Sequence, residues 1–310
     1  MHKIKVAVIG TGYLGSIHAK IYQQLPNCQL VAVCDVNPNR LEQVCQDLKI
    51  CGVIDYRELI GKVDAVSICV PTSLHFKVAC DFLTAGIPCL VEKPFTKTLS
   101  EADILIRIAR RKKTILAVGH VERYNSAFTA CQKYFQQPYF IECHRLSPFT
   151  HRSLDIGVVL DLMIHDIDIC LGLVRLPLRR IEAIGVNVLT SYEDIANARL
   201  HFDNGCIANL TASRISDETV RKIRIFLKNA YISLDYKNQH AFLYQKKSQT
   251  QITKTILPIE KDQPLEKELS AFVYAVATKT KPLVTGEIAR QALAVALSIR
   301  DQIWRKLKKF

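Results

Sequence analysis

The chain has 310 residues, of which 49% are hydrophobic and 23% are charged. These proportions exclude a disordered chain, a collagen and a small disulfide scaffold, and the length suggests two domains that each bury a core. Lysine and arginine outnumber aspartate and glutamate by 42 to 29, which leaves a formal net charge of +13. Such an excess predicts an anionic partner, but it does not choose among nucleotide, sugar phosphate, nucleic acid and acidic lipid.

The cysteines and the N-terminus indicate a cellular compartment. The 11 cysteines are scattered and form no CxxC pair, which argues against a zinc site and favours reduced thiols. An apolar run begins directly after Lys3, without the long apolar stretch of a signal peptide. No uncharged run approaches the roughly 18 residues of a transmembrane helix. We therefore expect a soluble, cytoplasmic protein without a metal.

Strand-like and helix-like segments alternate along the first part of the chain. Short apolar runs rich in β-branched residues end at glycine, proline or acidic residues, and amphipathic segments lie between them. This alternation predicts a doubly wound parallel sheet, a Rossmann fold, which binds ligands at the carboxyl ends of its strands. Strands are expected at residues 4–9, 30–34, 64–70, 88–91 and 114–118, with helices at 16–25, 41–48, 75–85 and 99–112.

The pattern changes after about residue 123. A series of strand-like runs follows, with a strong hairpin signal at residues 203–205 (Asp-Asn-Gly). It predicts an open, mostly antiparallel sheet, so the fold class is α/β with a Rossmann domain at 1–123 and a second α/β domain at 124–310. Strands are expected at residues 139–145, 180–189, 195–202, 206–213, 222–227, 231–236 and 241–245, and helices at 158–174 and 287–308.

The first strand-like run ends in a glycine-rich turn that opens a helix. Three glycines stand at the spacing GxGxxG, and Asp35 follows the third by twenty positions at the end of the next strand. That context is typical of a dinucleotide-binding turn, whereas the glycines alone would also suit a structural turn. The first glycine permits a tight turn, the second lets backbone approach a pyrophosphate, and the third lets helix pack on strand. The cofactor-binding residues expected here are Gly10, Gly12, Tyr13, Leu14 and Gly15.

Asp35 indicates which dinucleotide to expect. Its carboxylate can accept hydrogen bonds from ribose hydroxyls, and its charge would repel a 2′-phosphate. NAD is therefore favoured over NADP. Arg40 keeps NADP open, because a nearby arginine can accommodate that phosphate.

Glu92-Lys93-Pro94 follows the fourth strand-like run, at an expected carboxyl end. The proline restricts Lys93 to an extended backbone, which helps to point a fixed ammonium donor into the crevice. Such a donor could bind a substrate oxygen and lower the pKa of a neighbouring base. A solvated surface lysine is the alternative interpretation.

Asp161 and His165 interrupt an apolar helical segment. Four residues apart, they lie on one face of an α-helix about one turn from each other. A histidine that titrates near neutrality is the usual proton acceptor when an alcohol is oxidised. The alternatives are a structural core histidine and a metal site, for which no second histidine or thiolate stands at ligand spacing.

Together these motifs resemble one known family. The chain is similar over its whole length to the glucose-fructose oxidoreductase and inositol dehydrogenase family (Gfo/Idh/MocA). The resemblance rests on the glycine-rich turn at 10–15, Pro71-Thr72 with His75, Glu92-Lys93-Pro94, Gly119-His120, and Asp161 with His165 followed by Asp168.

The resemblance implies a Rossmann domain joined to an α/β domain whose open sheet often makes subunit contacts, so we expect a homodimer or homotetramer. It also implies that the nicotinamide lies near the Glu92-Lys93-Pro94 motif. Lys93, Asp161 and His165 would contact the reacting hydroxyl, with His165 as general base. Further cofactor contacts are expected at Arg40, Pro71, Thr72, His75, Glu92 and Lys93.

Residues 119–125, 144–149 and 161–169 resemble the branch of this family associated with bacterial lipid A assembly, which includes UDP-N-acetylglucosamine 3-dehydrogenases. A UDP-sugar carries a diphosphate, which arginines can bind in a bidentate manner. Each arginine could equally be an ordinary surface residue. The substrate-binding residues expected are Lys93, His120, Arg123, Tyr124, Arg145, Arg152, Asp161 and His165.

The expected function is hydride transfer between NAD and a secondary hydroxyl of a sugar, such as UDP-N-acetylglucosamine at its 3-position. The alternatives are a dehydrogenase of a free sugar or cyclitol, and a catalytically silent NAD-binding regulator. Basic runs at 107–113 and 303–310 are read as solvated helix faces, with contact to a membrane surface as the alternative. No nucleic-acid partner is expected.

Overall fold

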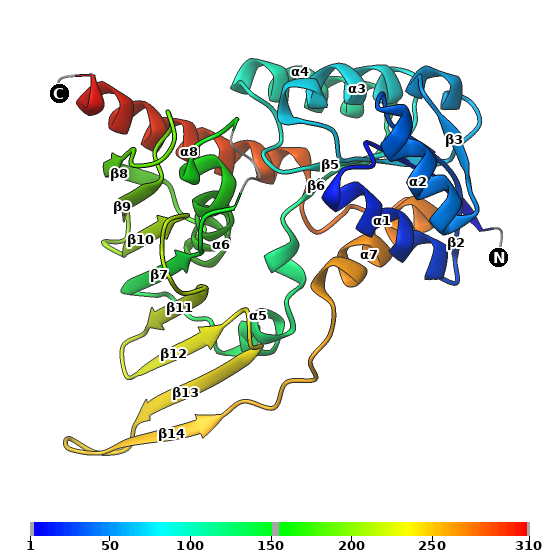
Figure 1. Cartoon of the computed structure of the whole chain (residues 1–310). Coiled ribbons are helices and arrows are strands. Elements are labelled where there is room, and N and C mark those ends of the chain that lie inside the picture. Colours follow the sequence, from blue (N-terminus) through cyan, green and yellow to red (C-terminus); the bar gives the residue numbers. More distant parts are fainter. Residues whose placement is uncertain (1–2, 151–154, 309–310) are drawn as a thin grey trace. The chain divides into compact units, whose positions relative to one another are not determined.

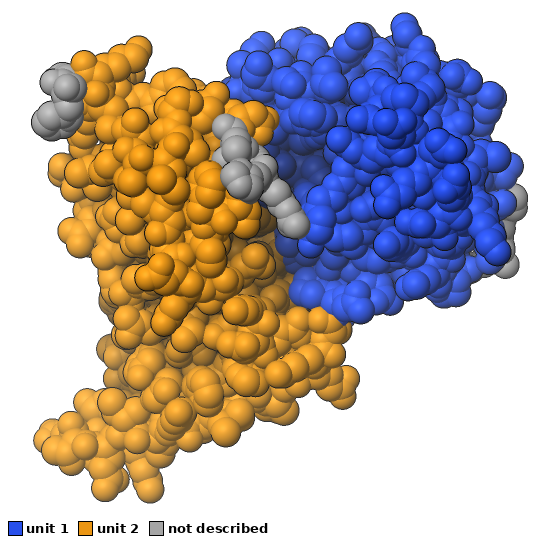
Figure 2. Space-filling view, in the orientation of Figure 1, with its two compact units in different colours: residues 1–121, 263–290 blue, residues 122–262, 291–310 orange. Residues whose placement is uncertain are grey.

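The computed structural model of the chain describes residues 3–150 and 155–308 (Figure 1). The chain divides into two compact units (Figure 2): unit 1 comprises residues 1–121 and 263–290, and unit 2 comprises 122–262 and 291–310. The first boundary between the units follows residue 121, and residues 263–290 return to unit 1. The expected domain bounds of 1–123 and 124–310 stay predictions.

Unit 1 contains a six-stranded parallel sheet in the order β3-β2-β1-β4-β5-β6. The order reverses between β1 and β4, which is the switch point where such sheets bind ligands. β1, β4 and β5 are almost wholly buried, because helices cover both faces of the sheet. The strands are β1 (Ile4–Ile9), β2 (Cys28–Cys34), β3 (Cys51–Val53), β4 (Ala65–Ile68), β5 (Cys89–Glu92) and β6 (Leu116–Gly119).

The helices of unit 1 form two layers on this sheet (Figure 1). On one face lie α1 (Tyr13–Gln24), α2 (Pro38–Leu48) and α7 (Pro264–Thr278), and on the other α3 (Thr72–Thr84) and α4 (Leu99–Lys112); the short helix η1 is Tyr56–Leu59. Local sequence fixes several helix starts: Asn37 caps α2 ahead of Pro38, and Thr98 with Glu101 forms a capping box on α4. Apolar residues of α1, α2 and α7 share one core with β1 and β2.

Unit 2 is built on an eight-stranded sheet in the order β14-β13-β12-β11-β7-β10-β9-β8. Only β7 and β10 pair in parallel, and every other neighbouring pair in this described sheet is antiparallel. Burial alternates residue by residue along the central strands, so one face is covered and the other is open. The strands are β7 (Phe140–Leu146), β8 (Leu178–Val186), β9 (Ile195–Phe202), β10 (Ile207–Ser213), β11 (Val220–Phe226), β12 (Ala230–Asp235), β13 (His240–Lys246) and β14 (Ile252–Ile256).

The expected helix at 158–174 is present, but its first part is a π-helix. η4 (Val159–Met163) has π geometry and continues directly into α6 (Ile164–Val174). Wider turns of this kind are frequent at functional sites. The remaining helices are η2 (Val121–Tyr124), α5 (Ser126–Cys131), η3 (Gln132–Tyr134) and α8 (Gly286–Leu307), which begins in unit 1 and ends in unit 2.

The predicted fold class is confirmed by the two sheets. The elements that the sequence did not predict include β3, β14 and α7. β3 has only three residues, and all of β14 is exposed, so neither carries an alternation of buried and exposed positions. Across the two described ranges, no helix is both long enough and apolar enough to cross a membrane.

Candidate dinucleotide and catalytic site

The three glycines of the turn between β1 and α1 meet three different steric conditions. Gly10 has φ +92°, and a Cβ there would lie 2.8 Å from the main chain of Cys69, so the turn crosses close over the end of β4. At Gly15 a Cβ would overlap the carbonyl oxygen of Gly10. At Gly12 nothing lies within 4 Å of the added atom. Thus two glycines are required by packing, and Gly12 leaves its main chain open to a ligand.

This geometry fits a dinucleotide. α1 begins at Tyr13 directly after Gly12, so the helix N-terminus presents main-chain N–H groups and the positive end of its dipole beside that open position. Its first turn contains no acidic side chain that would repel a phosphate. Gly10, Gly12, Tyr13, Leu14 and Gly15 therefore occupy the places that a pyrophosphate-binding turn requires.

Asp35, at the end of β2, is oriented toward the same turn. Its Oδ2 accepts hydrogen bonds from the main-chain N–H and the hydroxyl of Thr11, at 2.8 and 2.9 Å, and its Oδ1 accepts one from Asn37 N–H at 2.9 Å. Burial alone would raise the pKa of Asp35, but these hydrogen bonds outweigh it and lower the pKa below its ordinary value. The side chain is therefore an anionic acceptor at neutral pH. Arg40 Nη1 lies 3.5 Å from Asp35 Oδ2.

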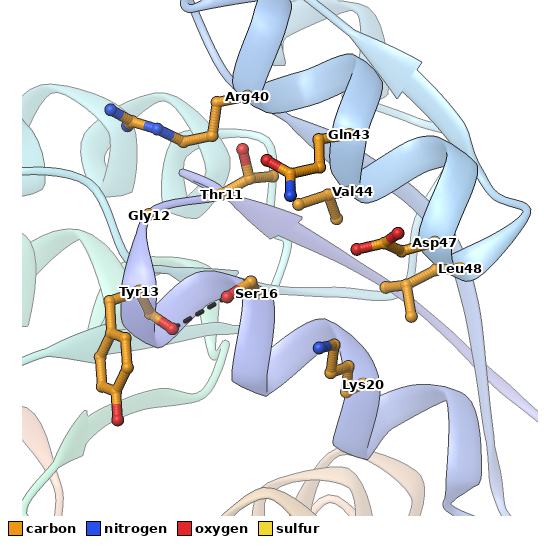
Figure 3. Close-up of a pocket in the computed structure, with 10 residues that line it drawn as sticks. All are labelled: Thr11, Gly12, Tyr13, Ser16, Lys20, Arg40, Gln43, Val44, Asp47 and Leu48. Carbon is orange, nitrogen blue, oxygen red and sulfur yellow. Dashed lines mark hydrogen bonds between the residues drawn. The ribbon is translucent and has the colours of Figure 1, made fainter.

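A cavity of about 310 Å³ adjoins the glycine-rich turn, between α1 and α2 (Figure 3). Gly12, Tyr13 and Arg40 are the expected cofactor residues that line it, so it continues from the turn along the two helices. The strand-end motifs of β4 and β5 do not contribute to its wall. Its lining residues are Thr11, Gly12, Tyr13, Ser16, Lys20, Arg40, Gln43, Val44, Asp47 and Leu48.

His75, in α3, joins the carboxyl ends of β4 and β5. Its Nδ1 lies 2.9 Å from the carbonyl oxygen of Pro94, and its Nε2 lies 2.9 Å from that of Val70. Burial lowers the pKa of His75, so the ring is neutral and donates to one of the two carbonyls. This histidine therefore lies between the two loops that carry Pro71-Thr72 and Glu92-Lys93-Pro94, and is hydrogen-bonded to one of them. A direct contact of His75 with the cofactor stays a prediction.

Glu92 is the last residue of β5 and is almost buried, at 8% exposure. Its Oε2 accepts a hydrogen bond from the main-chain N–H of Lys93 at 3.1 Å, and its Oε1 lies 3.2 Å from Nε2 of His18. Burial would raise the pKa of Glu92, but the contact with His18 outweighs it, with a contribution from Lys93, and lowers the pKa. Glu92 is thus an anchored anion that holds the main chain at Lys93.

Asp161 lies in the π-helix η4, and His165 lies in the first turn of α6. The start of this helix is held by the carboxylate of Glu193, a fully buried residue. Its Oε1 accepts from Val159 N–H at 3.3 Å, and its Oε2 accepts from Trp304 Nε1 at 2.9 Å. The segment that carries Asp161 is therefore fastened to α8.

Arg145 is placed differently from the sequence hypothesis. It is 3% exposed, and it donates from Nε and Nη2 to the two carboxylate oxygens of Asp166, at 3.0 and 2.9 Å. Its Nη1 donates to Glu122 Oε1 at 2.9 Å. Burial raises the pKa of Asp166 and Glu122 adds to this shift, while Arg145 opposes it. A guanidinium buried between two carboxylates does not fit the expected contact with a substrate diphosphate.

Arg123 is also paired within unit 2. Its Nε and Nη2 donate to the carboxylate of Asp168 at 2.6 and 3.0 Å, and Nη2 also donates to the Asp168 carbonyl oxygen at 2.7 Å. A Cβ on Gly172 would overlap this guanidinium, so the glycine makes room for the pair. The third candidate arginine, Arg152, lies outside the described residues.

The roles of the other expected substrate residues remain predictions. His120 is buried directly after β6, and Tyr124 is half-buried at the end of η2. Lys93 belongs to unit 1, while Asp161 and His165 belong to unit 2. Their shared catalytic role stays a prediction.

Several residues that support the site were not found from the sequence. Each is a buried polar residue, and only His18 has a recognisable sequence signal, because it stands three residues after Gly15 on the buried stripe of α1. The others depend on contacts between segments far apart in sequence. They are Thr11, His18, Ser67, Glu193 and Glu268.

Comparison with known proteins agrees with this geometry. A sequence profile described as "Oxidoreductase family, NAD-binding Rossmann fold" matches residues 4–120, and one described as "GFO/IDH/MocA C-terminal domain" matches residues 117–233. A UDP-N-acetylglucosamine 3-dehydrogenase of Acidithiobacillus ferrooxidans is 38% identical over 306 residues, which cover 97% of each chain.

A solved structure of UDP-N-acetylglucosamine 3-dehydrogenase GnnA from the same organism has a TM-score of 0.93 with 37% identity over 98% of each chain. A myo-inositol 2-dehydrogenase of Thermotoga maritima is 24% identical over 98% of this chain and 97% of its own. The fold, the glycine-rich turn and these matches lead to one conclusion: the chain belongs to the Gfo/Idh/MocA family of oxidoreductases with an NAD-binding Rossmann fold.

Proposed function

We propose that the protein is an NAD-dependent dehydrogenase that oxidises a secondary hydroxyl of a nucleotide sugar, with UDP-N-acetylglucosamine at its 3-position as the substrate. The observation that carries this proposal is the similarity to a UDP-N-acetylglucosamine 3-dehydrogenase at 38% identity over 97% of both chains. Such coverage includes the cofactor turn in unit 1 and the Asp161 and His165 segment in unit 2. The net charge of +13 suits a substrate that carries a diphosphate.

The cofactor would be held by unit 1. The main chain at Gly12 and the N-terminus of α1 would bind the pyrophosphate, and Asp35 would accept from the ribose hydroxyls. The ionised carboxylate of Asp35 favours NAD over NADP because it repels a 2′-phosphate. NAD, when bound, supplies the hydride acceptor for the reaction.

Three residues of the chain would remove the hydroxyl proton and bind the substrate oxygen. His165 takes the proton from the hydroxyl, while the Lys93 ammonium and Asp161 hold the oxygen as it becomes a carbonyl. NAD, held by the residues of unit 1, would supply the acceptor for the carbinol hydride, so the products would be a ketone, reduced cofactor and a proton. Arg145 and Arg123 take no part in this proposal, because both guanidiniums are paired with carboxylates of unit 2.

Absorbance of reduced NAD with a panel of UDP-sugars, cyclitols and free sugars tests the proposal. We expect turnover with UDP-N-acetylglucosamine, and a 3-keto product when its regiochemistry is read by NMR. Lys93→Met and His165→Ala should each lower kcat by roughly a hundredfold or more, the loss typical of a positioned acid-base group.

Near wild-type turnover in both variants would contradict the assigned roles. Preference for a cyclitol or free sugar would move the substrate to the alternative class. NAD binding without turnover of any panel member would favour a catalytically silent regulator.

The open face of the unit 2 sheet supports a homodimer or homotetramer. A row of aromatic side chains crosses it, with ring centroids 5.5 Å apart for Phe140 and Phe226, 5.2 Å for Phe226 and Tyr231, and 4.2 Å for Tyr231 and Tyr244. Apolar residues also stand exposed near one edge, including Ile184 and Val186 of β8. Light scattering after size exclusion should report a multiple of 35.1 kDa, and a monomer would contradict the proposal.

A further inference from the structure

A cluster of buried polar side chains lies inside unit 1, behind the Glu92-Lys93-Pro94 motif. We call it the His18 cluster: His18 of α1, Ser67 of β4, Glu92 of β5 and Glu268 of α7. His18 and Ser67 are fully buried, Glu268 is 1% exposed and Glu92 is 8% exposed. The mechanism above uses none of these side chains directly. Buried ionisable groups are costly unless they are paired, so their presence needs a physical reason.

The contacts of the cluster form a continuous chain that ends at Lys93. Ser67 Oγ lies 2.8 Å from His18 Nδ1, which fixes the ring. His18 Nε2 lies 3.2 Å from Glu92 Oε1. The other oxygen of Glu92 accepts the main-chain N–H of Lys93 at 3.1 Å. The position of the Lys93 backbone therefore depends on the Glu92 carboxylate, and the position of that carboxylate depends on His18.

The carboxylate of Glu92 has little freedom to move. Glu92 pairs with Gly119 of β6, and a Cβ on Gly119 would lie 2.9 Å from Glu92 Oε1 and 3.1 Å from Oε2. The neighbouring strand therefore contributes a glycine where a side chain would displace the carboxylate. Cys69 Sγ lies 3.5 Å from His18 Nδ1, the ring nitrogen that also contacts Ser67.

We propose that His18 is a positioning residue for hydride transfer: held by Ser67, it fixes the Glu92 carboxylate, and through it the backbone from which the Lys93 ammonium reaches the substrate oxygen. This inference rests on the proposed role of Lys93. It differs from a purely structural ion pair, because a structural pair would affect stability and leave the chemical step intact.

Two substitutions at one position separate these roles. His18→Gln places an amide nitrogen near the position of Nε2 and keeps the contact with Glu92. His18→Asn reaches only the position of Nδ1, so it keeps the contact with Ser67 and loses Glu92. In the full chain with NAD and UDP-N-acetylglucosamine, we expect His18→Asn to lower kcat by about tenfold to a hundredfold, as small displacements of a positioning group do.

The matched control is His18→Gln, which should retain kcat within about threefold of wild type. KM for the sugar and the calorimetric Kd for NAD should change by less than about threefold in both variants, because the proposed contacts of either ligand do not include His18. Wild-type kcat in His18→Asn overturns the proposal. An equal loss of kcat in both variants also overturns it, because the contact with Glu92 would then not matter.

A second variant and a structural measurement complete the test. Gly119→Ala leaves His18 intact and displaces Glu92 from the other side, so it should reduce kcat as His18→Asn does, and wild-type kcat there contradicts the proposal. If the wild type turns over no sugar, the proposed function fails. The inference is then decided by crystal structures of the NAD complexes, in which an unmoved Lys93 backbone in His18→Asn overturns it and a displaced backbone supports it.

Discussion

The two units bury charge in different ways. In unit 2, the buried guanidinium of Arg145 and the half-buried guanidinium of Arg123 each donate to carboxylate oxygens within 3.0 Å. In unit 1, Glu268 is as deeply buried as Arg145, yet neither of its carboxylate oxygens has a hydrogen-bond partner among the described residues. Burial raises the pKa of Glu268 well above its ordinary value, with a further contribution from Glu92, while His18 opposes the shift.

The comparison indicates that the buried charges of unit 2 stabilise the fold, whereas the buried carboxyl group of Glu268 in unit 1 destabilises it. Fully paired charges fix one arrangement of a core, whereas a partly satisfied network is tolerated where function requires it. We expect Glu268 to remain protonated at neutral pH, beside an ionised Glu92. Substitutions in the ion pairs of unit 2 should therefore change only the free energy of unfolding. Substitutions in the His18 cluster should change the free energy of unfolding, its dependence on pH, and kcat.

The largest expected effect comes from Arg145→Met. It leaves Asp166 and Glu122 buried without their cation, so the free energy of unfolding should fall by about 3–5 kcal/mol. Urea denaturation of the full chain measures this free energy. The value for Arg145→Lys should lie between those of the wild type and Arg145→Met, because lysine keeps the charge but loses the bidentate contact. An unchanged free energy of unfolding together with a raised KM for the UDP-sugar would instead support a substrate-binding role for Arg145.

A smaller loss is expected from Asp168→Asn. The amide keeps the shape of the side chain but loses the charge that receives the Arg123 guanidinium, so the free energy of unfolding should fall by about 1.5–3 kcal/mol, the range of hydrogen bonds to charged groups. The same urea titration reports it. Turnover per folded molecule should stay at the wild-type level, and a lowered kcat with unchanged stability would contradict a structural role.

The smallest expected effect has the opposite sign. Glu268→Gln should raise the free energy of unfolding at pH 7 by about 0.5–2 kcal/mol, the range of single stabilising changes. A raised pKa means that the folded state binds the Glu268 proton more tightly than the unfolded state does. Wild-type stability should therefore decline as the pH rises above the ordinary value of 4.5. Glutamine cannot ionise, so the difference between variant and wild type should widen with pH.

Urea titrations of both proteins between pH 5 and pH 8 check this sign. Burial would lower the pKa of His18, but contacts with Cys69 and Glu92 outweigh it and raise the pKa well above 6.5. Because of this shift, the free energy of unfolding should also decline as the pH rises above 6.5, and this decline should persist in Glu268→Gln. A difference between the two proteins that stays constant across the range would show that Glu268 does not carry the proton.

The elements that sequence could predict were those with a local cause. The glycine-rich turn, Asp35 after β2 and the alternation in the unit 2 sheet all follow from periodicity and turn chemistry within about 30 residues. The partners of Arg145 and Arg123 could not be predicted in this way, because an arginine that faces solvent and one paired inside a core look alike in a chain. The same holds for Glu268, which is separated from the other residues of the His18 cluster by more than half of the sequence.

The π geometry at η4 shows a second limit. An Asp161 and His165 pair four residues apart fits both an α-helix and a widened turn, so the spacing does not distinguish the two geometries. The start of this helix is held by Glu193, which lies in a distant loop. Local spacing predicts that a helix is present, while tertiary contacts decide its detailed shape.

The late return of residues 263–290 has a consequence for how the chain can be made and divided. α7 brings Leu269, Phe272 and Val273 into the core shared with α1 and α2. During synthesis, every strand of both sheets therefore leaves the ribosome before α7 does, and only then can the core of unit 1 be completed. A recombinant fragment that stops after β6 would leave that apolar face in water, so a self-sufficient cofactor-binding fragment has to include α7 on an engineered linker.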